Sequence, residues 1–210
     1  MRLRLFATAV LTLVVASSLC AQTIDVFARA TEATREGTTH VHGGQATVSL
    51  NSARGYEVGA DLFWSQRIST ELSIGSVDHE LDASAFGETV DLGSSRVSPI
   101  SAIVEFHTDP QGPFDIHAGA GASFVRFDDV QNSAELALLG VRSIKFHDKV
   151  APVANAGAAY RLGPRIALTA DVKWFDIRTK STATYLDGTS EGADLNLKQV
   201  TLGAGLSFRF

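Results

Sequence analysis

The amino-acid sequence predicts an all-β fold, an eight-stranded antiparallel transmembrane β-barrel with short periplasmic turns and long extracellular loops. Three observations lead to this prediction. An export signal precedes the rest of the chain, apolar and polar residues alternate in eight segments, and short connections between these segments alternate with long ones. Together they favour a membrane barrel over a soluble β-sandwich.

The first twenty-one residues have the layout of a secretory signal peptide. Arg2 and Arg4 precede an apolar run from Leu5 to Val15, which ends at the small polar pair Ser17 and Ser18. This run is shorter than the roughly 20 residues that a helix needs to span a bilayer. We therefore expect residues 1–21 to be a removed signal peptide, with cleavage after Ala21, and residues 22–210 to form the outer-membrane β-barrel.

Composition argues against several classes of function. The single cysteine, Cys20, lies within the signal, so the mature chain would have no disulfide framework and no thiolate metal site. A lipoprotein acylated at Cys20 is disfavoured because Leu19 precedes that cysteine. Loss of Arg2 and Arg4 shifts the formal net charge from −5 to −7, so we expect no nucleic acid as partner.

Apolar residues alternate with polar ones along the chain and form no second long apolar run. From Val200 to Phe210 every second residue is apolar or small, which is the period of a strand. The same period predicts strands at Ile24–Ala33, Tyr56–Trp64, Glu71–His79, Ile100–His107, Phe114–Phe124, Val150–Leu162 and Ile166–Trp174. Tilted strands of about 9–11 residues can cross a bilayer.

The connections between these strands alternate in length. Tight turns are predicted at Gln66–Thr70, Asp109–Pro113 and Gly163–Pro164. Long polar stretches separate them, at Thr34–Gly55, Leu81–Ser95, Phe127–Lys149 and Ile177–Leu197. Outer-membrane barrels have short periplasmic turns and long external loops, so each long stretch is expected outside the cell.

The last strand ends on two aromatic residues at alternate positions, Phe208 and Phe210. This ending resembles the C-terminal signal by which the barrel assembly machinery recognises outer-membrane barrels. We therefore expect this machinery and outer-membrane lipid as partners, with the apolar face of each strand against lipid.

The opposite face of each strand would then line a lumen too narrow for a wide water channel. Its polar members are predicted to form a network of Arg29, Glu57, Asp61, Glu105, Arg161, Asp171, Lys173 and Arg209. Its apolar members, a candidate gate, are Phe27, Phe63, Ile103, Val125 and Phe175. The polar set can be a mutually paired plug that stiffens the barrel, and the apolar set favours a gate or ligand pocket.

The sequence contains no convincing catalytic or metal-binding motif. The serines of the strands, such as Ser73, Ser101 and Ser123, fall on the inward face, where we interpret them as lumen packing. His40 and His42 are a weak metal pair because no third ligand lies nearby. The remaining histidines, His107 and His117 among them, are interpreted as polar filler, so we expect no catalytic residue, metal or cofactor.

Three stretches resemble the OmpW family of outer-membrane β-barrels, which includes AlkL-like uptake proteins for small hydrophobic molecules. They are Ser98–Phe127, Asp171–Thr179 and Asp194–Phe210, and their order and spacing also match. The chain departs from the family at Ile116–Gly121, where Tyr-x-Gly-x-Gly is usual. This departure does not affect the predicted fold, but it leaves the chemistry of the lumen undetermined.

The resemblance implies a bacterial outer-membrane protein that gives small hydrophobic molecules passive passage through a gated or laterally opening lumen, without a chemical step. The family's gating positions cannot be transferred residue by residue, so the candidate gate rests on the alternation alone. The alternative is a structural, ligand-binding or adhesive barrel whose polar lumen is sealed and whose function lies in the external loops. A lipid-modifying enzyme ranks third.

Overall fold

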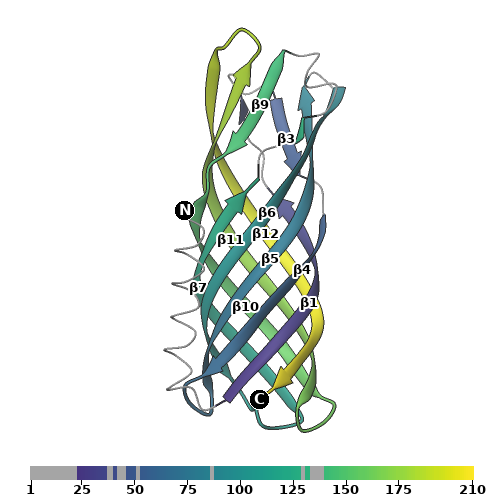
Figure 1. Cartoon of the computed structure of the whole chain (residues 1–210), viewed down its shortest axis with the longest axis vertical. Coiled ribbons are helices and arrows are strands. Elements are labelled where there is room, and N and C mark those ends of the chain that lie inside the picture. The colour runs from purple at the N-terminus through teal and green to yellow at the C-terminus, as the bar shows by residue number, and fades with distance from the viewer. Residues whose placement is uncertain are drawn as a thin grey trace.

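Eight long antiparallel strands form a closed barrel in the computed structural model, as the sequence predicts (Figure 1). The structure describes residues 23–36, 40–41, 46–50, 53–85, 88–128, 131–132 and 140–210. The predicted signal peptide at residues 1–21 and His42 lie outside these residues. The barrel strands are β1 (Thr23–Glu36), β4 (Ala53–Phe63), β5 (Ile68–Ala85), β6 (Glu88–His107), β7 (Phe114–Phe127), β10 (Lys149–Arg161), β11 (Ile166–Tyr185) and β12 (Ser190–Arg209).

Each barrel strand pairs with its neighbour in the chain, and β12 closes the barrel by pairing with β1 from Asp25↔Arg209 to Glu36↔Lys198. Among the described residues, closure pairs each barrel strand on both sides, so most backbone groups of the wall find partners there, except in one stretch between β10 and β11. Four shorter strands extend one end of the barrel: β2 (His40–Val41), β3 (Ala46–Leu50), β8 (Gln131–Asn132) and β9 (Val141–Phe146).

Three tight turns lie together at the other end, which we call the short-turn end. Backbone hydrogen bonds close them from Trp64 to Ile68, from Thr108 to Ile116 and from Leu162 to Ile166. The start of β1 and the C-terminal Phe210 lie at the same end, joined by the bond from the Phe210 N–H to the Ile24 carbonyl. The three predicted turns are therefore found, but the first lies at residues 64–67 and the last three residues of the predicted Gln66–Thr70 belong to β5.

Two of the four predicted long loops are instead long β-hairpins, which form what we call the long-hairpin end. Pairing of β5 with β6 continues to Ala85↔Glu88, and pairing of β11 with β12 continues to Thr184↔Ser190. The stretches Leu81–Ser95 and Ile177–Leu197 are predicted as loops because they are long polar segments between two apolar strands. In β11 the alternation of buried and exposed side chains ends at Lys180, and the residues beyond it are partly exposed, so this signal is lost there although the ladder continues.

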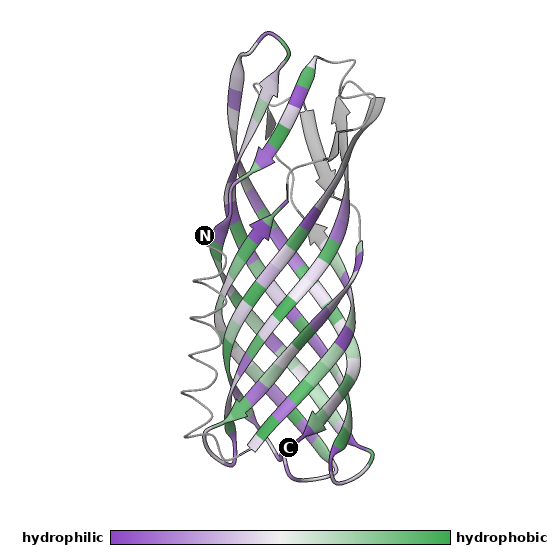
Figure 2. Cartoon of the chain, viewed as in Figure 1, coloured by the Kyte–Doolittle hydropathy of each residue, from purple (hydrophilic) through white to green (hydrophobic). Residues whose placement is uncertain are grey.

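The barrel carries an apolar belt on its outer surface and buries charged residues in its lumen, which reverses the arrangement of a soluble protein. Large hydrophobic residues on every barrel strand face outward and are exposed, for example Val104, Ile116, Leu168 and Leu202. Figure 2 shows hydrophobic and hydrophilic residues alternating along the strands. An exposed apolar belt of this extent is typical of a surface that contacts lipid. Within the described residues, no helix is long and apolar enough to span a membrane.

Candidate functional site

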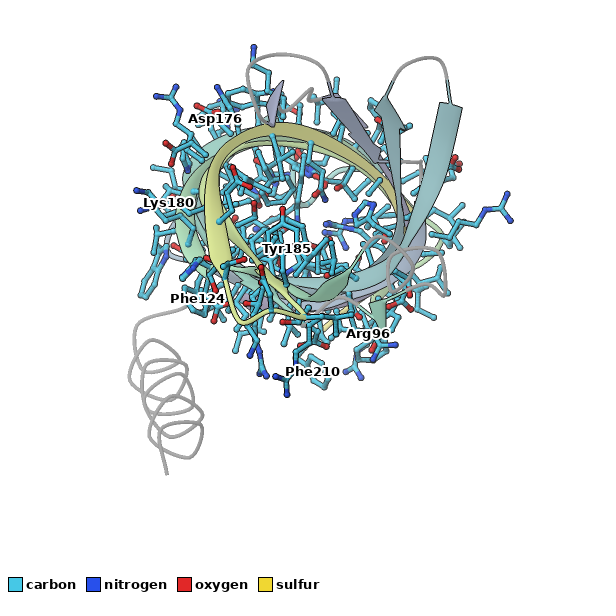
Figure 3. All side chains as sticks on the ribbon, turned by 90° about the horizontal axis from the view of Figure 1, so that it is seen from above. Arg96, Phe124, Asp176, Lys180, Tyr185 and Phe210 are labelled. Carbon is cyan, nitrogen blue, oxygen red and sulfur yellow. The ribbon has the colours of Figure 1, made fainter. Side chains whose placement is uncertain are left out.

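The structure places both predicted lumen sets inside the barrel. The apolar candidates Phe27, Phe63, Ile103, Val125 and Phe175 are each at most 5% exposed. The polar candidates also face inward, with Asp61, Arg161 and Arg209 more exposed than the others. Viewed along the barrel axis, side chains project into the lumen from all sides, whereas Arg96, Lys180 and Phe210 lie outside the wall (Figure 3).

Two arginines close the lumen at the short-turn end. Arg209 makes a two-point ion pair with Asp25, with both N–O distances 2.5 Å, and its Nη1 donates to the Pro110 carbonyl at 2.8 Å. Arg161 donates to the same carbonyl. Pro110 belongs to the turn between β6 and β7, so the two arginines hold this turn across the mouth of the barrel. Arginine suits this position because its planar fork binds two acceptors at once.

Above this closure lies an ionic network that crosses the lumen. Arg29 Nη1 lies 3.1 Å from Glu71, 3.4 Å from Glu57 and 3.8 Å from Asp171. Lys173 Nζ lies 2.6 Å from Glu71 and also contacts Glu57. These residues come from β1, β4, β5 and β11, and none is more than 7% exposed.

Carboxylates outnumber cations in this part of the lumen. Asp61 and Glu105 add to the acidic side, and a donor atom from each of Asp61, Glu71 and Glu105 lies within 4.8 Å of the others. Asn155 donates to Glu105, which ties β10 into the same layer. Buried charges persist where they are paired and hydrogen-bonded, so the network holds opposite sides of the wall together.

Two of the five apolar candidates belong to this polar region. The Arg29 guanidinium carbon lies 3.8 Å from the centre of the Phe27 ring, and the Arg209 guanidinium lies 5.3 Å from that of Phe63. A Cβ on Gly59 would come within 2.5 Å of the Phe27 ring, so the glycine makes room for it. Phe27 and Phe63 thus pack under cations, a common arrangement for aromatic rings.

The other three apolar candidates, Ile103, Val125 and Phe175, lie in a separate apolar layer. The buried members of this layer are Val97, Ile103, Val125, Phe127, Ala151, Val153, Phe175, Ile177 and Leu197. Most of them lie nearer the long-hairpin end than the ionic network does, according to the strand registers. The lumen is therefore charged near the short-turn end and mainly apolar farther up, where His79, Ser95, Thr179 and Gln199 are buried polar residues at the same level.

The barrel wall is interrupted beside the apolar layer. Pairing of β10 with β11 stops at Val153↔Phe175. Contact resumes where the His147 N–H donates to the Lys180 carbonyl and β9 pairs with β11 from Ser181↔Phe146. Pro152, which has no backbone N–H to donate, is the first residue beyond the last pair. A cavity of about 720 Å³ adjoins the interruption and is lined by residues that include Lys149, Thr179 and Asp194.

One cluster was missed by the sequence reasoning. His107, Asp115 and His117 meet in the lumen beside the turn between β6 and β7. His107 and His117 face each other across the hairpin, and Asp115 lies two residues from His117 on the same face of β7. The tight turn at Asp109–Pro113 and strand parity together could have placed all three in one group.

Several solved structures of small outer-membrane barrels are similar to this chain. OprG from Pseudomonas aeruginosa superposes with a TM-score of 0.76 at 15% identity, over 90% of this chain and 96% of OprG. AlkL, solved in lipid bilayers, superposes with a TM-score of 0.62 at 21% identity, over 90% of each chain. Neisserial surface protein A gives 0.55 at 16% identity, over 89% of this chain and 97% of the other. No protein of curated function matches the sequence.

The closed wall, apolar outer belt and filled lumen define an eight-stranded β-barrel of the bacterial outer membrane. The short-turn end is its periplasmic end, and the long-hairpin end is extracellular. The model of the OmpW family matches residues 18–210, and the chain belongs to this family. The expected resemblance to that family is therefore confirmed.

Proposed function

We propose that this protein gives small hydrophobic molecules passive passage across the outer membrane. The observation that carries the proposal is the apolar layer in the lumen, which lies beside an interruption in the wall and above a closed ionic network. An apolar molecule that enters from the extracellular end meets Phe175, Ile177 and their neighbours before it meets any buried charge. The likeness to AlkL, at 21% identity, supports the barrel fold and not a particular substrate.

The exit that we propose is lateral, through the interrupted ladder between β10 and β11. Passage straight down would require the Arg29 and Lys173 ion pairs to separate inside the barrel, which costs several kcal/mol per uncompensated charge. Val150 and Trp174, which flank the interruption, face outward and are 63% and 40% exposed. A molecule leaving between these strands would therefore enter an apolar environment without passing the network.

Uptake by vesicles tests this proposal. The protein without residues 1–21 is reconstituted into vesicles whose outer leaflet contains lipopolysaccharide, a layer that slows apolar molecules. The initial uptake rate of an apolar fluorescent probe is then measured. We expect faster uptake than in protein-free vesicles, and equal rates would refute the proposal.

A disulfide across the interruption tests the lateral exit. Extension of the β10–β11 register would place Ala151 opposite Ile177, and both residues are 1% exposed in the apolar layer. Oxidation of an Ala151→Cys, Ile177→Cys variant should lower probe uptake, and reduction should restore it. The matched control is Ala158→Cys with Ala170→Cys, a directly opposed pair in the intact ladder, where oxidation should have no effect. Equal behaviour of both pairs would rule out this exit.

The closed ionic network favours a second candidate, a sealed barrel that acts through its external loops. Such a barrel would show no probe uptake. Its binding or adhesive activity would depend on residues within Thr34–Gly55 and Phe127–Lys149. Activity that survives shortening of both stretches would exclude this candidate.

A further inference from the structure

The cluster of His107, Asp115 and His117 has the geometry of a metal site near the periplasmic end of the lumen. One donor atom from each residue lies within 4.8 Å of the other two. All three side chains are buried, with residue exposures of 4%, 6% and 5%. His107 and His117 are opposed in the β6–β7 register, so the hairpin itself brings the two imidazoles together.

Each imidazole turns its Nε2 atom toward a carboxylate. His107 Nε2 lies 2.9 Å from Ser69 Oγ and 3.5 Å from Glu105 Oε2, and His117 Nε2 lies 3.7 Å from Asp171 Oδ2. Metal-binding histidines commonly donate their second N–H to a carboxylate or another acceptor, which fixes the tautomer and leaves the other nitrogen for the metal. The His107 ring, which is bonded through Nε2 to Ser69, would present Nδ1, and the His117 ring has a buried Nδ1 available.

The two Nδ1 atoms are in different situations. His107 Nδ1 lies 2.6 Å from Asp115 Oδ2. His117 Nδ1 is buried and has no hydrogen-bond partner among the residues that the structure describes. A buried polar atom without a partner destabilises the folded state. An ion pair between His107 and Asp115 explains the position of His107 Nδ1 but leaves His117 Nδ1 without a partner. A metal ion shared by the three residues would bind both Nδ1 atoms.

The carboxylate is also held in place. Asp115 Oδ1 accepts bonds from the Thr108 hydroxyl at 3.2 Å and from the Asp109 N–H at 2.9 Å, so Oδ2 is the oxygen that faces the imidazole of His107. A Cβ on Gly157 would lie 2.4 Å from His117 Nε2, so the position of this ring requires glycine there. The three donors are thus positioned by their surroundings.

The charges around the cluster favour a cation. The neighbouring carboxylates Glu105 and Asp171 belong to the network in which carboxylates outnumber Arg29 and Lys173. The arginines at the mouth have their own partners, because Arg209 pairs with Asp25 and Arg161 donates to Pro110. A divalent ion would offset part of the remaining negative charge.

We propose that His107, Asp115 and His117 bind a divalent transition-metal ion. Two imidazoles and one carboxylate suit Zn²⁺, Co²⁺ and related ions, with solvent completing the coordination. The ion would tie the β6–β7 hairpin into the polar floor of the lumen. This inference is independent of the proposed passage of hydrophobic molecules.

Titration of the refolded chain without residues 1–21 tests the site. The protein is stripped with EDTA in detergent and titrated with Co²⁺, whose visible absorption reports coordination, and Zn²⁺ is then added as competitor. We expect about one equivalent per chain with three protein ligands. His117→Ala should abolish this binding, and Ser69→Ala, which removes a partner of His107, should weaken it by about 10–100-fold. The matched control replaces His40, His42 and His147 by Ala and should bind like the wild type.

Three results would overturn the proposal: no stoichiometric binding by the wild type, binding unchanged in His117→Ala, or binding lost in the control. Where His117→Ala fails to refold, X-ray absorption of the Zn²⁺-loaded wild type decides the question. Two imidazole ligands are then expected, and a spectrum with fewer would reject the site.

Discussion

Replacement of Lys173 by Met should destabilise the barrel strongly. Lys173 is 2% exposed, and its Nζ contacts Glu57, Glu71 at 2.6 Å and Ser73 at 3.3 Å. Methionine fills a similar volume but leaves these two carboxylates with Arg29 as their remaining cation in the network. Removing one partner of a buried ion pair costs about 3–5 kcal/mol, so the free energy of unfolding should fall by this amount.

Urea unfolding in lipid vesicles measures this effect. Trp64 and Trp174 report unfolding by fluorescence, and the heat-dependent gel shift of folded barrels checks the starting state. The matched control is Lys180→Met, because Lys180 is 76% exposed and its pair with Asp194 spans 3.7 Å. This control should change stability by less than about 1 kcal/mol.

A second substitution tests the cause of the loss. Glu71→Gln added to Lys173→Met removes one of the two carboxylates that lost their lysine partner, and it should recover part of the lost free energy of unfolding. A double-mutant cycle measures this recovery as a coupling energy between positions 71 and 173. A Lys173→Met barrel within about 1 kcal/mol of the wild type would show that the network contributes little, contrary to the expected cost of breaking a buried ion pair. Absence of coupling with Glu71 would show that lost packing, and not charge, explains any destabilisation.

Three further substitutions test other parts of the barrel. Phe27→Ala should cost about 3–5 kcal/mol in urea unfolding, because it removes a buried ring, and a loss below about 1 kcal/mol would contradict its packing under Arg29. Gly157→Ala should cost about 1–3 kcal/mol in the same assay, since its Cβ would lie 2.7 Å from the Ala170 carbonyl oxygen; unchanged stability would show that the strands can shift apart. Phe210→Ala should lower the amount of folded barrel in the outer membrane of cells, because Phe210 is part of the predicted assembly signal. It should not change urea unfolding of the refolded protein, because Phe210 is 76% exposed. A normal amount of folded barrel in cells would contradict the predicted role of Phe210 as an assembly signal.

The direction of each lumen side chain could be predicted because strand period is a local property. Phe27, Glu57 and Lys173 fall on the inward face by parity alone, and burial in the structure agrees with that placement. The extent of the hairpins could not be predicted in the same way. In β11 the alternation of buried and exposed residues ends at Lys180, so the outer part of Ile177–Leu197 resembles a loop although it forms a ladder.

The contacts inside the lumen depend on closure and register, which no local pattern encodes. Lys173 meets Glu57 and Glu71 across separations of 116 and 102 residues. For the same reason, the five apolar residues predicted as a candidate gate fall into two separate regions of the lumen. Phe27 packs under Arg29, whereas Phe175 belongs to the apolar layer. His107 and His117 are an exception, because the tight turn at Asp109–Pro113 and strand parity together could have placed them opposite each other across the hairpin, although these two signals were not combined.

The division of the lumen into a polar floor and an apolar upper layer separates stability from passage. If apolar molecules leave through the wall beside Val153 and Phe175, they never cross the network, and Lys173→Met should change stability far more than probe uptake. The oxidised Ala151→Cys, Ile177→Cys variant should do the reverse, since it closes the wall without touching a buried charge. In a sealed barrel neither variant would change uptake, because there would be none above the protein-free rate. Measuring both quantities on both variants therefore distinguishes a lateral conduit from a sealed barrel.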